Sequence, residues 1–74
     1  MKNVCFTRVS SRNLPNLHVA TVDGVEVGFC YKPAESKGDR NAWRSYIGIG
    51  DGARFLYHTW DKRDAMMAVT AAVN

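Results

Sequence analysis

Residues 17–31 read Leu-His-Val-Ala-Thr-Val-Asp-Gly-Val-Glu-Val-Gly-Phe-Cys-Tyr, and they carry the strongest local structural signal in the chain. Two runs rich in β-branched and aromatic residues flank the pair Asp23-Gly24. An Asp-Gly pair accepts the positive φ angles of a type I′ turn, whose twist matches that of the two strands it joins. The stretch therefore predicts a β-hairpin formed by residues 17–22 and 25–31.

Further strands are predicted on both sides of this hairpin. Residues 4–9 alternate in the pattern of a strand and precede a segment of turn formers. After the polar residues 33–42, for which we expect an exposed loop, residues 43–49 and 53–60 flank a second Asp-Gly pair. They predict a second hairpin, whose register is loosened by the neighbouring glycines. The chain thus predicts an antiparallel sheet of four to five strands.

The sequence period changes after residue 60. Asp61 carries a carboxylate that can cap a helix over residues 62–73, and Asp64 places a second carboxylate in the positive first turn. The apolar residues of this segment share one stripe and are mostly small, which lets the helix axis approach a sheet closely; they are Ala65, Val69, Ala72 and Val73, with Met66 and Ala68 at the edges. We therefore expect an α+β fold with one C-terminal helix packed on one sheet face, in a single domain spanning 1–74.

Length and composition limit the classes of protein. The 74 residues, 46% hydrophobic and 23% charged, indicate a folded chain with one small core and exclude large enzymes and cofactor-binding folds. The net charge of +3 suits an acidic partner without requiring one. There is no apolar run near the roughly 18 residues of a membrane span and no signal-peptide segment, so we expect a cytoplasmic protein. Cys5 and Cys30 are too far apart for a zinc knuckle, and we expect both to be buried thiols.

Side-chain alternation assigns the strand residues to two faces. The set expected to face the core is Val25, Val27, Phe29, Tyr31, Trp43, Ser45, Ile47, Ile49, Phe55, Tyr57 and Thr59. One helix covers only one face, so the alternating set leaves a mixed cationic and aromatic face, which is the candidate site. Its residues, with two cations of the loop, are Lys32, Lys37, Arg40, Arg44, Tyr46, Arg54, Leu56, His58 and Trp60.

This candidate face is compatible with more than one partner. Arginine and aromatic residues are enriched in protein-interface hot spots. The same residue types contact phosphates and stack on bases in nucleic-acid complexes. A protein partner, a nucleic acid and a plain solvated face therefore remain three open interpretations of the pattern.

The sequence offers little for catalysis or metal binding. Neither His18 nor His58 has the neighbouring ligands of a metal site. Cys30 meets His58 only if their strands are adjacent, and a strand cysteine is more often a packed residue. The glycines of residues 48–52 are followed by a strand pattern rather than the helix that a phosphate loop requires. We expect no enzymatic activity, no metal and no cofactor.

A resemblance covers residues 25–74. Trp43-Arg44-Ser45-Tyr46-Ile47 and the run from Ala53 to Asp61, followed by the alanine-rich helix, resemble the plant AP2-type DNA-binding domain. They are also similar to the three-stranded amino-terminal domains of phage-type integrases. Those families lay the sheet in the major groove with the helix behind it, which implies DNA contacts for Arg44, Tyr46, Arg54 and Leu56. The short length, basic balance and strand–helix ending are also similar in style to small bacteriophage accessory proteins.

The sequence therefore predicts a small non-enzymatic binding protein. The leading interpretation is a phage-type accessory factor that occludes or redirects a host protein or a protein–nucleic-acid complex, away from any membrane. Direct DNA binding through the exposed sheet face is the alternative. Pairing of the sheet with a second copy, which would give a homodimer, also stays open because so small a domain buries a limited share of its surface.

Overall fold

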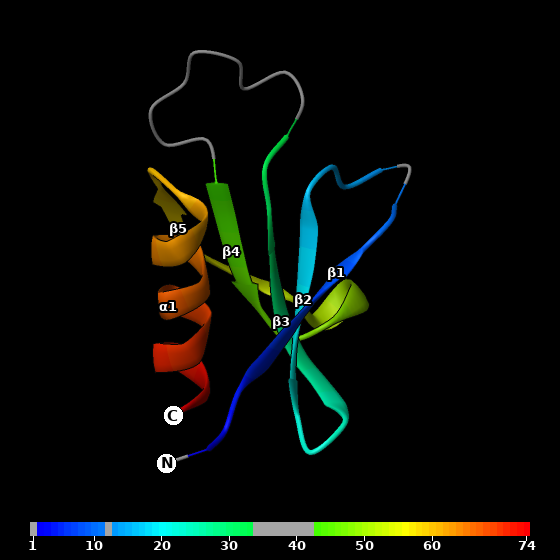
Figure 1. Ribbon diagram of the computed structural model, residues 1–74, viewed down its shortest axis with the longest axis vertical. Coiled ribbons are helices and arrows are strands. Elements are labelled where there is room, and N and C mark those ends of the chain that lie inside the picture. The colour runs from blue at the N-terminus through cyan, green and yellow to red at the C-terminus, as the bar shows by residue number, and fades with distance from the viewer. Residues whose placement is uncertain (1, 12, 34–42) are drawn as a thin grey trace.

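The computed structural model describes residues 2–11, 13–33 and 43–74. Five strands form one antiparallel sheet in the order β1-β2-β3-β4-β5, and a single C-terminal helix packs against it (Figure 1). This confirms the expected α+β class. Most of the loop expected at residues 33–42 lies outside the described residues. The elements are β1 (Cys5–Val9), β2 (Leu17–Val22), β3 (Val25–Tyr31), β4 (Trp43–Ile47), β5 (Arg54–Thr59) and α1 (Lys62–Val73).

The hairpin of β2 and β3 is the one that the sequence predicts. Asp23 and Gly24 have φ angles of 53° and 80°, so both central residues of the turn are left-handed as a type I′ turn requires. Val22 pairs with Val25 directly across the turn. Farther along the hairpin, Ala20 pairs with Gly28 and Thr21 with Glu26. Val27 is therefore an extra residue of β3, which forms a β-bulge.

The hairpin of β4 and β5 is also formed, but both strands are shorter than expected. β4 ends at Ile47, and a 3₁₀ turn at Gly50–Gly52 precedes β5. Gly48 and Gly50 have left-handed φ angles of 89° and 67°. These two residues are not consecutive, so the connection is not a two-residue type I′ turn. The Gly48 N–H donates to the Val27 carbonyl at 2.7 Å, so this connection is fastened to β3.

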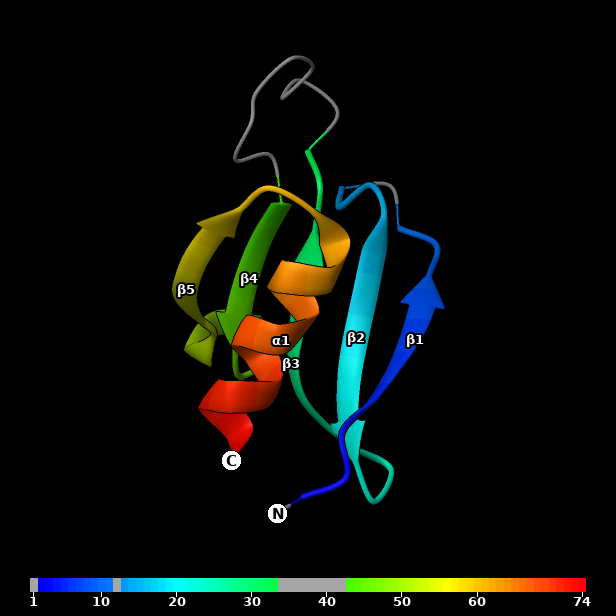
Figure 2. The same ribbon diagram turned by 60° about the vertical axis from the view of Figure 1, so that its left-hand side comes forward.

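The helix begins where the sequence predicts. Asp61 Oδ1 accepts a hydrogen bond from the Asp64 N–H at 2.9 Å, which satisfies one of the free donors of the first turn. Ala65 and Val69 are the buried residues of α1, whereas Ala72 is exposed, so the buried stripe is narrower than expected. The helix contacts β3, β4 and β5 and lies along one side of the sheet (Figure 2).

Small side chains form the contact between α1 and the sheet. Ala20, Cys30 and Ser45 are fully buried, together with Ala65 and Val69 of the helix. The buried Ser45 hydroxyl donates to the Tyr57 carbonyl at 3.2 Å and accepts from the Tyr57 N–H at 3.3 Å, so the helix-side core contains a satisfied polar group.

Candidate functional site: the open face of the sheet

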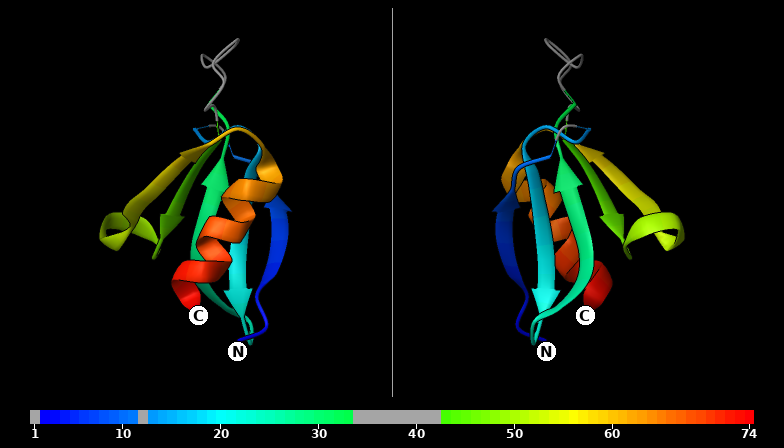
Figure 3. Two further views of the ribbon diagram at one scale, coloured as in Figure 1. Left: turned by 90° about the vertical axis from the view of Figure 1, so that its left-hand side faces the viewer. Right: turned by 90° about the vertical axis from the view of Figure 1, so that its right-hand side faces the viewer.

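The sheet has one face that α1 leaves uncovered. Figure 3 shows α1 in front of the strands from one side and behind them from the other. Among the described residues there is no second α-helix to cover the opposite side. We call this side the open face, and cross-strand pairing identifies the residues that lie on it.

The contact between Gly28 and α1 fixes the two faces. A Cβ atom added at Gly28 would lie 2.9 Å from Val69 Cγ1, so Gly28 faces the helix. Cross-strand partners share a face, and alternation then places Cys30, Ser45 and Ile47 on the helix side. The opposite set lies on the open face: Phe29, Tyr31, Arg44 and Tyr46.

This assignment corrects the expected faces of β3. Side-chain alternation predicts Phe29 and Tyr31 in the core and Cys30 on the exposed face, whereas the structure reverses both. The physical reason is steric, because α1 approaches β3 so closely that only a glycine and a small thiol fit beneath it. Within β4 the expected faces are confirmed by the burial of Ser45 and the position of Tyr46. Ile49, which alternation also places in the core, lies beyond β4 and is 41% exposed.

A bulge also changes the faces of β5. Ser45 pairs with Tyr57 and Tyr46 with Phe55, so Leu56 is an extra residue between them. Phe55 therefore joins Tyr46 on the open face instead of the core. Arg54 pairs with Ile47 and lies on the helix side. The expectation that Arg44 and Arg54 share one face is consequently wrong.

The open face carries a continuous aromatic row. Phe29 and Tyr46 stack at a centroid distance of 4.7 Å with an angle of 11° between their planes. Tyr31 lies 6.4 Å from Phe29 and 6.1 Å from Tyr46. Phe55 meets Tyr46 edge-on at 5.5 Å, and His58 lies 4.8 Å from Phe55. These five rings, Tyr31, Phe29, Tyr46, Phe55 and His58, are here named the aromatic row.

Tyr46 and Tyr31 of the aromatic row carry hydroxyl groups, and Tyr46 interacts with Tyr31 and with Arg44. Burial raises the pKa of Tyr46, a hydrogen bond and charge interaction with Tyr31 raise it further, and Arg44 acts in the opposite direction. The Tyr46 phenol therefore stays protonated at neutral pH. Tyr46, Tyr31 and Arg44 together give the row a site that both donates hydrogen bonds and carries a positive charge.

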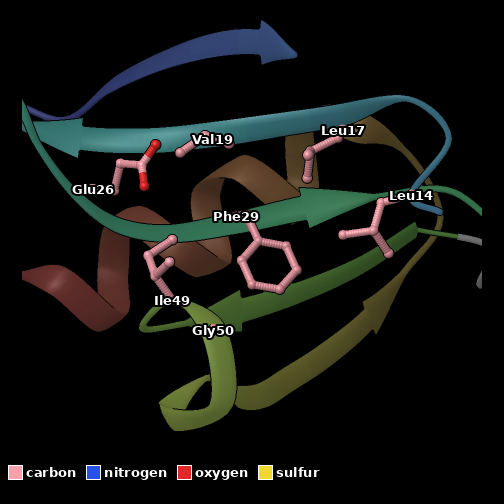
Figure 4. Close-up of a pocket in the computed structure, with 7 residues that line it drawn as sticks. All are labelled: Leu14, Leu17, Val19, Glu26, Phe29, Ile49 and Gly50. Carbon is pink, nitrogen blue, oxygen red and sulfur yellow. The ribbon is translucent and has the colours of Figure 1, made fainter. Parts of the chain in front are cut away.

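An apolar groove continues the row toward β2. Its volume is about 320 Å³, and Phe29 belongs to both surfaces. Leu14 and Ile49 come from the connections that precede β2 and follow β4, and they border the groove (Figure 4). The remaining lining residues are Leu17, Val19, Glu26 and Gly50. We call this feature the Glu26 groove.

The other candidate residues are dispersed. Leu56 is half-buried at the bulge, and Lys32 follows β3, where its N–H donates to the Pro15 carbonyl at 3.2 Å. Trp60 is exposed just beyond β5. Lys37 and Arg40 lie outside the described residues. The structure thus gathers Arg44, Tyr46 and His58 of the nine candidates on the open face.

Sequence reasoning missed Phe29, Tyr31, Phe55 and the Glu26 groove. One feature of the sequence indicates the correct face of β3. Gly28 and Cys30 have small side chains, and they suit close packing against a helix whose apolar stripe is rich in alanine. A large aromatic set facing such a helix would hold it farther from the sheet. The bulge at Leu56 had no comparable signal.

The structure does not bring Cys30 and His58 together. Cys30 is fully buried beneath α1, whereas His58 pairs with Arg44 on the open face. Burial raises the pKa of the Cys30 thiol from 9.0 to about 11, and Lys62 opposes this rise. A thiol with so high a pKa is a poor nucleophile at neutral pH. Cys5 is exposed, which corrects the expectation that both thiols are buried.

The two cysteines are expected to differ in their reactivity in the folded protein. A thiol-reactive disulfide dye at pH 8 should label Cys5 in the folded protein, and Cys30 should react only after denaturant is added, because it is buried and protonated. The Cys5→Ser variant should therefore show almost no fast reaction. Fast labelling of that variant would contradict the burial of Cys30.

Comparisons with protein-family models, curated proteins and solved structures find no match for this chain. In residues 2–11, 13–33 and 43–74, no group of three or more His, Cys, Asp and Glu side chains is arranged to hold a metal ion. The described helical structure also lacks a segment with the length and apolarity needed to cross a membrane.

Proposed function

We propose that this chain is a non-enzymatic binding protein that acts by occupying a surface of another protein. The aromatic row on the open face is the observation that carries the proposal. Rings that are partly exposed and continuous across three strands supply rigid apolar contact area, which is the composition of interface hot spots. Arg44 beside Tyr31 and Tyr46 adds the polar contact that orients a partner.

The distribution of charge supports a protein partner over DNA. The positively charged strand residues are Arg8, Arg44 and Arg54. Arg8 pairs with His18 and Arg54 with Ile47, both on the helix side, so Arg44 alone of these three lies on the open face. Affinity for DNA depends on several lysine and arginine contacts to phosphates, whereas the described strands place one such residue, Arg44, on this face.

The arrangement of the rings supports the same choice. Proteins that stack single-stranded bases present ring faces to the nucleic acid. Phe29 and Tyr46 instead stack on each other, so each covers one face of the other, and Phe55 meets Tyr46 edge-on. This packing gives a compact apolar surface suited to protein side chains.

The biological role that fits these features is that of a phage-type accessory factor in the cytoplasm. Such a factor needs no cofactor, because blocking or redirecting a host protein requires only surface occupation. The small size and basic balance of the chain support this role. A protein–nucleic-acid complex is a suitable host target if its protein component makes the contact with the aromatic row.

The proposal is tested by capture from a bacterial lysate, with and without nuclease, followed by titration of the purified captured protein. Two variants form a matched pair on β5: Phe55→Ala changes the open face, and Tyr57→Ala changes the helix side. Their side chains are 47% and 62% exposed, so neither truncation empties the core. We expect capture to survive nuclease and Phe55→Ala to weaken affinity about tenfold or more, while Tyr57→Ala changes it little.

Two results would overturn the proposal. Loss of the captured material after nuclease would assign the contact to nucleic acid. Equal effects of the two β5 variants would show that the open face does not make the contact.

A further inference from the structure

The Glu26 groove is apolar except for one carboxylate. Leu17 and Val19 are only 8% and 9% exposed and form its floor, while Ile49 is 41% exposed at its border. Phe29 supplies another wall and links the groove to the aromatic row. A partner that covers the row therefore also meets the groove.

Glu26 is the charged residue that lines this groove. Within the part of the chain that the structure describes, Glu26 is exposed and makes no ion pair or side-chain hydrogen bond. The chain has a net charge of +3, so its cationic side chains outnumber its anionic ones. The charged residue that lines the groove is nevertheless the anion Glu26. An unpaired carboxylate beside apolar surface attracts a cation more strongly once a partner excludes water, because the effective dielectric constant falls.

We infer that the Glu26 groove recognises an extended segment of the partner in which a large apolar side chain is flanked by lysine or arginine. This inference rests on the proposed function and names the partner's chemistry. The apolar side chain fills the groove against Phe29 and Val19, and the cation pairs with Glu26. The groove has a volume of about 320 Å³. This volume is at the lower end of the roughly 300–1,000 Å³ typical of small-ligand pockets, so we expect the groove to hold one or two side chains.

The spacing of the two recognised side chains follows from strand geometry. In an extended segment, alternate residues point to the same side and lie roughly 6.5–7 Å apart. A cation two positions from the apolar residue therefore reaches the border of a groove that holds the apolar side chain. The expected pattern is a large apolar residue, any residue, and then lysine or arginine, in either chain direction.

Selection from a random heptapeptide library displayed on phage tests this inference. The wild-type protein should enrich peptides with the apolar–basic pattern. Glu26→Gln should abolish the preference for lysine and arginine, and Glu26→Lys should replace it with aspartate and glutamate. Asp64→Lys makes the same charge change on α1 and should keep the wild-type preference. Circular dichroism of each variant confirms that it is folded.

A synthetic peptide from the wild-type selection gives the quantitative measurement. Glu26→Lys should weaken its binding about tenfold or more, whereas Asp64→Lys should change it less than about threefold. The inference is overturned if the wild-type protein enriches no peptide, if the enriched peptides lack the apolar–basic pattern, or if Glu26→Lys leaves the selected charge unchanged.

These failures are distinguishable from failure of the proposed function. If Phe55→Ala abolishes capture of a host protein while Glu26→Lys leaves that capture intact, the open face is the contact surface and the groove assignment is wrong. If capture is insensitive to Phe55→Ala, the proposed function itself is wrong.

Discussion

Replacing Gly28 with alanine is expected to lower the free energy of unfolding by about 2–3 kcal/mol, the upper part of the range for overpacked cores. The added Cβ would lie 2.7 Å from the Tyr46 carbonyl oxygen and 2.9 Å from Val69 Cγ1. The backbone oxygen cannot rotate away, so β3 must separate from β4 or α1 must move outward. Urea denaturation followed by circular dichroism measures the loss.

Gly52→Ala is the matched control for this substitution. A Cβ at Gly52 meets nothing within 4 Å, and the residue does not need a left-handed φ angle. Its free energy of unfolding should stay within about 0.5 kcal/mol of the wild-type value. If Gly28→Ala were equally neutral, α1 would not approach β3 closely, and the assignment of Phe29 and Tyr31 to the open face would lose its steric basis.

Tyr46→Ala is expected to weaken binding to the captured partner about 30-fold, equivalent to about 2 kcal/mol. Tyr46 lies between Phe29 and Phe55 in the aromatic row, so its truncation removes contact area and one ring contact from each of these neighbours. Tyr46→Phe keeps the ring and loses only the hydroxyl, so it should weaken binding by a few-fold at most. Isothermal titration calorimetry with the purified partner measures both.

A third variant tests whether the effect belongs to the open face. Met67 is 58% exposed on α1, so Met67→Ala removes a large apolar side chain from another surface. Its affinity should equal that of the wild type. Equal losses for Met67→Ala and Tyr46→Ala, with all variants folded by thermal melting, would contradict an interface centred on the aromatic row.

The strands and the helix could be predicted from the sequence, because each has a local signal. Asp23-Gly24 defines one turn by its φ angles, and Asp61 defines the start of α1 by its capping hydrogen bond. The choice between the two faces of β3 is different, since it depends on contact with a helix more than thirty residues away. Counting apolar residues favours burying Phe29 and Tyr31, whereas the close approach of α1 requires Gly28 and Cys30.

The candidate site could be predicted only in part, because the faces of β5 depend on a bulge in its pairing with β4. Arg44, Tyr46 and His58 lie on the open face as expected, but the bulge at Leu56 turns Arg54 to the other side and brings Phe55 to the row. The residues that flank the bulge are polar and aromatic in both directions along the chain, so alternation gives no sign of it. Leu14 and Ile49 reach the groove from connections, which periodicity does not describe.

Hydroxyl-radical footprinting of the complex with the captured partner tests the open face most directly, because it reads the solvent exposure of individual aromatic side chains. Phe55 and Tyr57 are both accessible in the free protein and lie on opposite sides of β5. Binding should protect Phe55 and Tyr46 from oxidation, while Tyr57 and Met67 stay as reactive as in the free protein. Protection of Tyr57 and Met67 with Phe55 still reactive would show that the partner binds the helix side.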